Sequence, residues 1–386
     1  MAGVRASSFR SERSGLKTRL GGLPWGVILL LCAMAVIGVA TLHSATFTNP
    51  EEAGLPMKHA ARFSIAFVVL IVVALVPLKY WRMLAWPAYL ATLTLLVGVE
   101  FFGVMGGGAQ RWLQVGPVAV QPSEFMKVAL TLVLADYYHR NWHENSGSFL
   151  IHLPALGLII VPAALIFHQP DFGTTLALFA SGGILIFLAG LRWSVILSAT
   201  AIAVASVPVV YMFVLEDYQR ERVDTFLAQL TGEQVNVMDD GYQIEQAKIA
   251  VGSGGWLGKG YMEGTQAQLD YIPEQHTDFI LTVLAEEFGF LATSAVLLLW
   301  MTILGLGLMI AMRSPSLFGR FLAAGAVMTV AFYILFNVAM VLGLLPVVGV
   351  PLPFLSYGGT VMITTAVCFG LVCSVHLGHD EPLSSG

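Results

Sequence analysis

The sequence has few charged residues for its length. Asp, Glu, Lys and Arg make up 11% of its 386 residues, against about 25% in an average soluble protein. Hydrophobic residues make up 57%, and the mean hydropathy is +0.78. A chain of this composition cannot cover a water-facing surface, which excludes an assembly of ordinary soluble domains. Its basic residues are scattered and form no stripe, so we expect no nucleic-acid partner.

Cysteine is also scarce. The three cysteines, Cys32, Cys368 and Cys373, all lie in apolar runs. This placement supports neither a disulfide framework nor a zinc-ligand spacing. We predict that all three are small buried hydrophobic residues.

Long apolar runs dominate the chain instead. A membrane crossing needs about 20 apolar residues, and we therefore predict an all-α polytopic membrane protein with about ten transmembrane helices. The ten runs are Trp25–Thr46, Ala60–Val76, Met83–Val104, Val120–Tyr138, Phe149–Phe167, Gly173–Gly190, Trp193–Leu215, Asp278–Met312, Leu317–Leu345 and Gly358–Val375. The eighth run is too long for one straight crossing and carries Glu286 and Glu287 near its start. Its first turns should lie at the interface or beside a protein-filled cavity.

The Lys and Arg residues of the short segments indicate the orientation. Eleven of them fall on the side of the N-terminus and three on the opposite side. Because cytoplasmic loops carry the excess of Lys and Arg, both termini are predicted to be cytoplasmic. Residues 1–24 are then a flexible tail, residues 25–378 a single membrane domain, and residues 379–386 a second cytoplasmic tail. The polar insert at 216–277, between the seventh and eighth runs, is predicted to be extracytoplasmic.

This insert is the first place to look for chemistry, because loops longer than about 15 residues are usually functional or disordered. Its segment Tyr242–Val251 predicts an amphipathic helix lying on the membrane. The following GSGGWLGKG (Gly252–Gly260) superficially resembles a phosphate-binding loop. However, Ser253 and Gly260 stand where a Walker motif needs Gly and Ser or Thr. We expect a flexible, close-packed loop over a cavity.

The insert ends in IPEQHTDF, which places Glu274, His276 and Asp278 just before an apolar run. Three interpretations stay open. Thr277 suits a helix N-cap, and a carboxylate in the first turn is stabilised by the helix dipole. Alternating Glu, His and Asp could also coordinate a divalent cation, although a fourth ligand is missing. The third interpretation is a catalytic role.

More charged residues gather toward the outer half of the predicted bundle, namely Arg111, Glu124, Lys127 and Asp171. Charges inside a membrane are costly, so such a cluster indicates a substrate path or an active site. Glu124 and Lys127 are three residues apart on one helix face, and a structural ion pair is an equal alternative for them. The uncharged, Pro- and Gly-rich segment 343–360 predicts broken backbone that forms a lip over the same cavity.

Several long blocks of the sequence resemble one family, the shape, elongation, division and sporulation (SEDS) membrane glycosyltransferases, which polymerise peptidoglycan. The blocks are QRWLQVGPVAVQPSEFMK, HQPDFGTT, DYQRERVDTFL, GYQIEQAKIAVGSGGWLGKGYMEGTQAQLDYIPEQHTDF and LPVVGVPLPFLSYGG. They run from about residue 105 to residue 360. The insert is more similar to the elongation members than to the division members. Phe172 departs from the family, in which Leu is common, but the change is conservative.

The resemblance implies ten helices in the bacterial inner (cytoplasmic) membrane, with a large outer loop between the seventh and eighth. It implies transfer of glycan chains between lipid II molecules, which forms β-1,4 bonds and releases undecaprenyl pyrophosphate. Asp278 matches the family's essential aspartate, and three residues match polar positions of its central cavity: Arg111, Lys127 and Asp171. With them we group Glu124, Glu274 and His276 as candidate substrate-binding residues. The implied partners are lipid II, membrane lipid and a class B penicillin-binding protein that supplies transpeptidation.

The implied chemistry assigns a role to each charge. A sugar hydroxyl is a poor nucleophile, and a carboxylate that accepts its proton can contribute about 10²–10⁴-fold. Asp278 is the candidate base. Arg111 and Lys127 are candidates for stabilising the pyrophosphate that leaves. A divalent cation, magnesium or manganese, stays open, with its ligands unassigned.

Other classes of protein use the same ingredients. A lipid flippase or transporter also needs charged residues in its spans, broken helices and a cavity near mid-membrane. A non-catalytic scaffold of a cell-wall complex would explain the spans but not the clustered charges. Within the family, the division paralogue is the alternative to an elongation enzyme.

Overall fold

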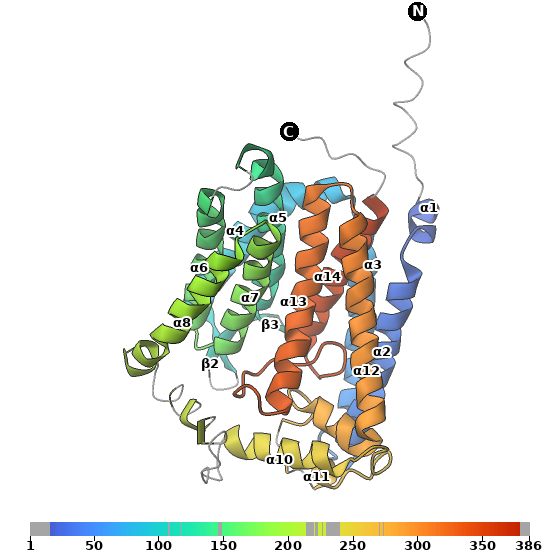
Figure 1. Cartoon of the computed structure of the whole chain (residues 1–386). Coiled ribbons are helices and arrows are strands. Elements are labelled where there is room, and N and C mark those ends of the chain that lie inside the picture. Colours follow the sequence, from blue (N-terminus) through green and yellow to red (C-terminus); the bar gives the residue numbers. More distant parts are fainter. Residues whose placement is uncertain are drawn as a thin grey trace, which may run out of the picture.

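The structure is a computed structural model that describes residues 16–106, 109–116, 118–145, 149–213, 220, 223–225, 227–228, 240–269, 271–272 and 274–378. Each of the ten predicted runs overlaps one long helix of the described chain (Figure 1). These helices are α2 (Trp25–Ala45), α3 (Leu55–Leu75), α4 (Leu78–Phe102), α5 (Pro122–Asn145), α6 (His152–His168), α7 (Phe172–Leu188), α8 (Trp193–Phe213), α12 (Ile280–Arg313), α13 (Leu317–Val341) and α14 (Gly359–Leu377). The short helix η1 (Phe149–Ile151) precedes α6.

The two predicted tails fall largely outside the described residues. The described end of the first tail forms α1 (Leu16–Gly21). There the Arg19 guanidinium donates to the Leu75 carbonyl at 3.0 Å and ties the segment to the end of α3.

Seven helical segments of the described chain are long and apolar enough to cross a membrane. They are Trp25–Ala45, Leu55–Leu75, Leu78–Phe102, Phe149–His168, Ile280–Arg313, Leu317–Val341 and Gly359–Leu377. Helix α7 is apolar but has only 17 residues. Helix α5 carries charges along its length, including Glu124, Lys127 and Asp136. The chain is therefore a multi-pass helical membrane protein.

Helix boundaries differ from the apolar runs that predicted them. Helices α3 and α4 begin at Leu55 and Leu78, five residues earlier than the predicted Ala60 and Met83. Backbone hydrogen bonding does not require apolar side chains, so a helix can continue into polar sequence. The position of a proline sets the start of α4 instead. Pro77 is the N-cap of this helix, where its missing N–H costs no helical hydrogen bond.

The prediction of an all-α protein missed one small antiparallel sheet between α4 and α5. Strand β2 (Ala109–Val115) pairs with β1 (Val104–Gly106) on one side and with β3 (Val118–Val120) on the other. Gly116 at the β2–β3 turn has φ +62°, a conformation that glycine adopts without steric cost. In the sequence this sheet is marked by glycines at its turns and by a short alternation of apolar and polar side chains. It is not marked by an apolar run.

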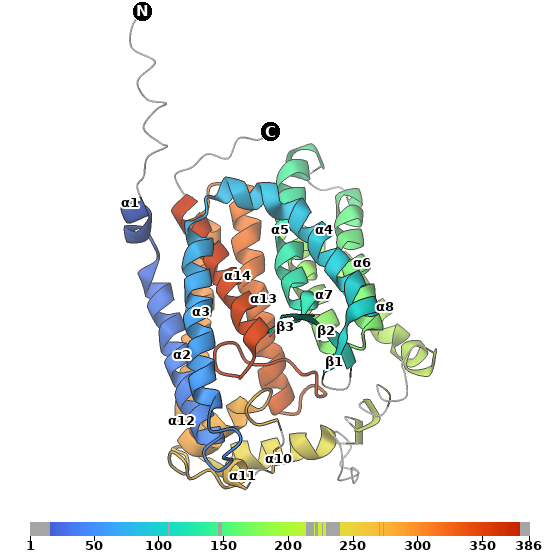
Figure 2. The same cartoon turned by 180° about the vertical axis from the view of Figure 1, so that it is seen from behind.

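Helices α13 and α14 form the centre of the bundle. Both bury most of their apolar residues, whereas α3 and α4 fully bury only a minority of theirs. Helix α13 packs against α5, α7, α12 and α14, and α14 packs along α3, as Figure 2 shows. The backbones approach closely, since a Cβ added at Gly38 would lie 2.2 Å from the Phe354 carbonyl oxygen. Cys368 and Cys373 are buried in α14, as predicted, while Cys32 is only partly buried.

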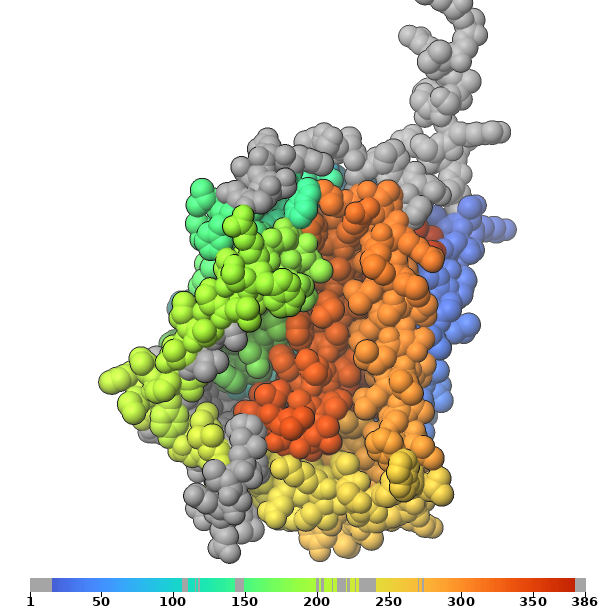
Figure 3. Space-filling view, in the orientation of Figure 1, coloured from blue at the N-terminus to red at the C-terminus, as the bar shows by residue number. Residues whose placement is uncertain are grey.

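The predicted amphipathic helix is present as α10 (Asp240–Ser253), which crosses one end of the bundle together with α11 (Thr265–Gln268). We expected its apolar face to lie on the membrane. Instead Ile244, Ala247 and Ala250 are buried, and α10 packs on α12 and α13 (Figure 3). The bundle end offers α10 an apolar protein surface, which the sequence pattern alone cannot distinguish from lipid.

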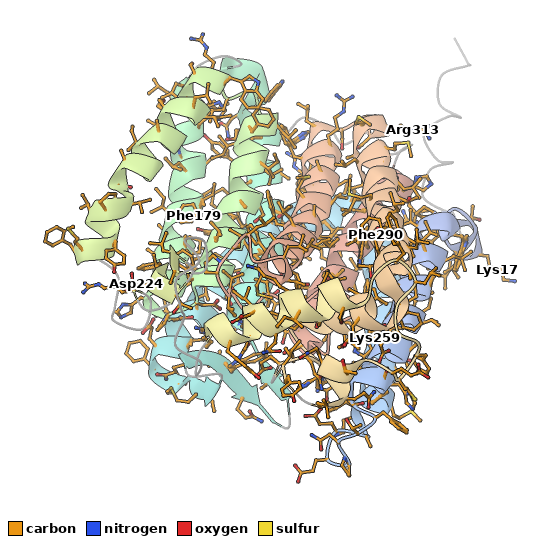
Figure 4. The ribbon with its side chains drawn as sticks, turned by 60° about the horizontal axis from the view of Figure 1, so that its bottom comes forward. Lys17, Phe179, Asp224, Lys259, Phe290 and Arg313 are labelled. Carbon is orange, nitrogen blue, oxygen red and sulfur yellow. The ribbon has the colours of Figure 1, made fainter. Side chains whose placement is uncertain are left out.

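The glycine-rich segment after α10 is not a flexible loop but is bonded into a kink of α12. Gly289 has φ +72° inside this helix, which interrupts the helical hydrogen-bond ladder. The N–H groups of Lys259 and Gly260 donate to the carbonyls of Glu286 and Glu287, at 3.0 and 2.9 Å. The N–H of Phe290 returns a bond to the Gly255 carbonyl at 2.9 Å. Figure 4 views this end of the molecule and labels Lys259 and Phe290.

The first turns of α12 are therefore surrounded by protein, as the acidic residues at its start predicted. Glu286 is fully buried, and its Oε1 accepts bonds from the Lys259 ammonium at 2.6 Å and the Gln266 N–H at 3.0 Å. Glu287 is 1% exposed and accepts a bond from the Ser44 hydroxyl of α2. Glu286 therefore fastens the segment between α10 and α12 to the bundle, and Glu287 bonds α12 to α2.

Candidate active site

Asp278 lies just before α12, at the end of a run of turns over residues 274–279. The N-cap of α12 is Phe279, and no side chain caps this helix. The prediction of Thr277 as the cap is therefore wrong: its hydroxyl donates to the Glu274 carboxylate at 2.7 Å. Asp278 is partly exposed, so its carboxylate lies at the boundary between the packed bundle and solvent.

A buried asparagine and an irregular loop hold Asp278 in place. The Asn337 amide of α13 donates to the Asp278 carbonyl at 2.7 Å and to the Val350 carbonyl at 2.8 Å. Gly349 has φ +65°, and a Cβ at this position would lie 3.6 Å from the Asp278 Oδ2. The predicted broken backbone, 343–360, is non-helical except for Gly359 and Thr360, which begin α14. The non-helical segment 342–358 passes directly beside the Asp278 carboxylate.

Glu124 and Lys127 form a buried ion pair on α5. Their charged atoms lie 2.6 Å apart, and the side chains are 4% and 1% exposed. The Tyr333 hydroxyl of α13 donates to the other Glu124 oxygen, and the Lys127 ammonium lies 4.4 Å from the centre of the Tyr333 ring. The geometry thus favours the structural ion pair, because both charges already have partners.

Arg111 and Asp171 form a second, more open pair. Arg111 projects from β2, and its guanidinium donates to the carbonyls of Gln169 and Pro170. It lies 3.9 Å from the Asp171 carboxylate, and its side chain is 25% exposed. Asp171 is the N-cap of α7, where it accepts a bond from the Thr174 N–H. Arg111 is the cation of this group that a ligand can reach.

The irregular segment 342–358 links the Arg111–Asp171 pair to Asp278. A Cβ at Gly173, in the first turn of α7, would lie 2.1 Å from the Val348 carbonyl oxygen. The next residue, Gly349, lies beside the Asp278 carboxylate. The structure therefore brings Arg111, Asp171 and Asp278 to one side of the bundle, around one loop.

The remaining candidate residues, Glu274 and His276, lie at the rim of this site. Glu274 is exposed. His276 is partly exposed, with its Nδ1 3.7 Å from the Glu52 carboxylate, and its carbonyl accepts a bond from the Tyr357 N–H at 2.9 Å. Among the described residues, no three His, Cys, Asp or Glu side chains come close enough to hold a metal ion. The alternating Glu274, His276 and Asp278 do not form the ligand set considered from the sequence.

Sequence reasoning missed the neutral residues that organise the site. Tyr333 and Asn337 lie four residues apart in an otherwise apolar run. Polar side chains in a span are costly whether or not they are charged, so this spacing was a usable signal. Tyr357, whose ring lies 4.1 Å from the Arg62 guanidinium carbon, offered no comparable pattern.

Comparison with known proteins identifies the family. The family model FTSW_RODA_SPOVE, described as "Cell cycle protein", matches residues 22–380. The chain belongs to this family. The resemblance inferred from the sequence blocks is thereby confirmed.

Individual relatives agree with this assignment. Peptidoglycan glycosyltransferase MrdB of Escherichia coli K12 is 38% identical over 362 residues, covering 93% of this chain and 94% of that protein. A chain from the structure "Structural coordination of polymerization and crosslinking by a peptidoglycan synthase complex" has a TM-score of 0.80 at 27% identity. It covers 93% of this chain and 99% of its own length. Thermus thermophilus rod shape determining protein RodA shares the fold, with a TM-score of 0.69 at 24% identity over 93% and 98% of the two chains.

Proposed function

We propose that this protein polymerises lipid II into β-1,4-linked glycan strands during cell elongation and releases undecaprenyl pyrophosphate. The 38% identity to a peptidoglycan glycosyltransferase over nearly the whole chain supports this activity. The observation that supports this location of the active site is the partly exposed Asp278, whose backbone is fixed by buried Asn337.

The proposed topology has ten crossings of the bacterial inner membrane, with both termini cytoplasmic and the 216–277 loop outside. Figure 1 supports it, because α1, the start of α8 and the ends of α5, α12 and α14 lie at one end of the bundle, opposite α10. That end carries Arg19, Arg140, Arg192 and Arg313, as expected of a cytoplasmic face. The membrane domain, 25–378, then forms one unit with the loop.

Asp278 acts in this proposal as the general base. It accepts the proton of the acceptor sugar hydroxyl as that oxygen attacks the donor sugar carbon and the bond to the pyrophosphate breaks. The non-helical segment 342–358 flanks the carboxylate without filling the position beside it, because Gly349 has no side chain. Glu274 and His276 lie at the rim, where they can contact the incoming substrate.

Arg111 is a better candidate than Lys127 for stabilising the pyrophosphate that leaves. Its partly exposed guanidinium is held in place by two backbone carbonyls. Negative charge develops on the leaving group in the transition state, and a preorganised cation stabilises it there. Lys127 has a different role in this proposal. With its charge matched by Glu124 and enclosed, it keeps α5 and α13 in register and so positions Asp171 and Asp278.

The partners in this proposal are lipid II, the surrounding membrane lipid and a class B penicillin-binding protein. The structure of a peptidoglycan synthase complex among the similar folds supports a partner enzyme.

The direct test is polymerisation of lipid II by purified protein in detergent, with and without the partner, and with magnesium or EDTA. Detergent removes the two leaflets, so a flippase or transporter can produce no signal. Glycan polymer supports the proposal. If no polymer forms even with the partner and magnesium, the protein is a transporter or a scaffold.

A further inference from the structure

A cavity of about 190 Å³ lies at the end of the bundle opposite Asp278, between the start of α6 and the start of α8. Its polar lining comes from His152, Arg192 and Ser194 and its apolar lining from Phe149, Leu191 and Val195. None of its described lining residues is acidic. From the structure we infer that this cavity binds the phosphate headgroup of an anionic membrane lipid.

The chain geometry places Arg192 at the cavity. Gly190 has φ +95° and turns the chain between α7 and α8, and the Arg192 carbonyl then accepts the first hydrogen bond of α8, from the Val195 N–H at 2.9 Å. The Arg192 side chain is exposed, and its guanidinium has no ion pair with any described residue. A guanidinium of this kind is suited to bidentate bonding with a phosphate.

His152 supplies a second donor that is fixed in advance. Its residue is 7% exposed, and its Nδ1 lies 3.0 Å from the hydroxyl of fully buried Tyr138. When that hydroxyl donates to Nδ1, the proton of the neutral imidazole resides on Nε2. Within the described chain Nε2 has no hydrogen-bond partner, and it is accessible to solvent. It is therefore the imidazole atom that can donate into the cavity.

Two further observations favour a lipid over a free phosphate ion. Apolar side chains complete the wall of the cavity, and Phe149 beside it is 51% exposed. The acyl chain of a bound lipid needs such an exposed apolar surface next to its headgroup. Trp193, adjacent to Arg192, is 66% exposed, and exposed tryptophan is typical of the headgroup level of a membrane. Basic pockets between membrane helices at the cytoplasmic face bind anionic headgroups elsewhere.

The test is native mass spectrometry of the full-length protein in detergent, titrated with phosphatidylglycerol and, in parallel, with phosphatidylcholine. Arg192→Gln should raise the dissociation constant for the first phosphatidylglycerol at least fivefold, and Arg192→Lys should restore part of the loss. The matched control is Arg313→Gln, which removes an exposed arginine from the same end of the bundle but outside the cavity. It should change the constant less than twofold.

Each other outcome overturns the inference. Equal weakening by Arg192→Gln and Arg313→Gln means that general surface charge, not the cavity, attracts the lipid. No weakening by Arg192→Gln, or equal affinity for phosphatidylcholine, removes the headgroup site. If millimolar inorganic phosphate displaces the lipid, the cavity is a free-phosphate site instead. Because lipid binding is measured without lipid II, these outcomes are independent of the proposed polymerase activity.

Discussion

Tyr333 and Asn337 lie one turn apart on α13, and each holds one part of the candidate site. The Tyr333 hydroxyl donates to Glu124, while the Asn337 amide donates to the carbonyls of Asp278 and Val350. Four residues advance a helix by about 6 Å. One buried helix therefore fixes the spacing between the internal ion pair and the backbone of the candidate base.

The first prediction concerns Asn337. Asn337→Leu removes the amide that donates to the Asp278 and Val350 carbonyls, and a buried acceptor left unpaired, as at Val350, costs about 1–3 kcal/mol. We expect a clear loss of stability and reduced polymerisation, because Asp278 loses its backbone anchor. The matched control is Thr329→Val on the same helix, since the Thr329 hydroxyl bonds only to the Gly325 carbonyl of its own turn. Unfolding in detergent and lipid II turnover measure both effects, and equal loss in the two variants would contradict the anchoring role.

The second prediction separates structure from chemistry in the Glu124–Lys127 pair. Lys127→Met leaves the Glu124 carboxylate buried without its cation, and breaking a buried pair costs about 3–5 kcal/mol. If the pair is structural, the double variant Glu124→Gln/Lys127→Met should recover most of the stability and the turnover. A double variant that folds normally but stays inactive would assign Lys127 to the substrate instead. Melting and turnover of Lys127→Met, Glu124→Gln and the double variant decide between the two roles.

The third prediction tests the orientation. In a background without Cys32, Cys368 and Cys373, a cysteine at Glu245 on α10 should react with a membrane-impermeant maleimide in spheroplasts. A cysteine at Arg313 should not react until the membrane is opened. Both positions are exposed, so burial cannot explain a failure to label. The reverse pattern would place Asp278 on the cytoplasmic side.

The sequence predicts local features of this protein well and long-range ones poorly. The apolar runs predict the long helices of the described chain because the hydrophobicity of a segment is a local property. The non-helical segment 342–358 was also predictable from its own Pro and Gly content. Which surface covers a helix depends on residues distant in the chain. The burial of α10 against α12 and α13 was therefore not predictable from its own sequence. The bonding of Lys259 to Glu286 across the kink at Gly289 has the same long-range origin.

Within the candidate site, the residue types were predictable but their pairing was only partly so. The spacing of Glu124 and Lys127 on one helix left two interpretations, and only the enclosure of both side chains distinguishes them. The sequence did not show that Asp171 faces Arg111, because Arg111 lies on a strand that was not predicted. The assignment of Asp278 as the base remains a prediction.

The fourth prediction concerns the kink of α12. Gly289 has φ +72°, and a Cβ there would lie 2.3 Å from the Gly258 backbone nitrogen. Gly289→Ala should therefore destabilise the protein by at least about 2 kcal/mol, since it combines a left-handed conformation with a backbone clash. Gly305→Ala on the same helix meets nothing within 4 Å. It should be neutral or slightly stabilising, and similar melting temperatures for the two variants would show that the kink is not a fixed feature.

The last prediction is that Asp278 is the catalytic base. Asp278→Asn keeps the size of the side chain but removes the proton acceptor, so polymerisation should fall at least about 100-fold. Lipid II binding and the melting temperature should stay near those of the unmodified protein, because Asn337 bonds to the backbone of this residue and not to its carboxylate. Glu245→Gln, which neutralises an exposed carboxylate on α10, is the matched control and should retain full turnover. If Asp278→Asn keeps more than about a tenth of the activity, a barrier change of only about 1.4 kcal/mol, Asp278 is not the base. Glu274 is then the next carboxylate to replace.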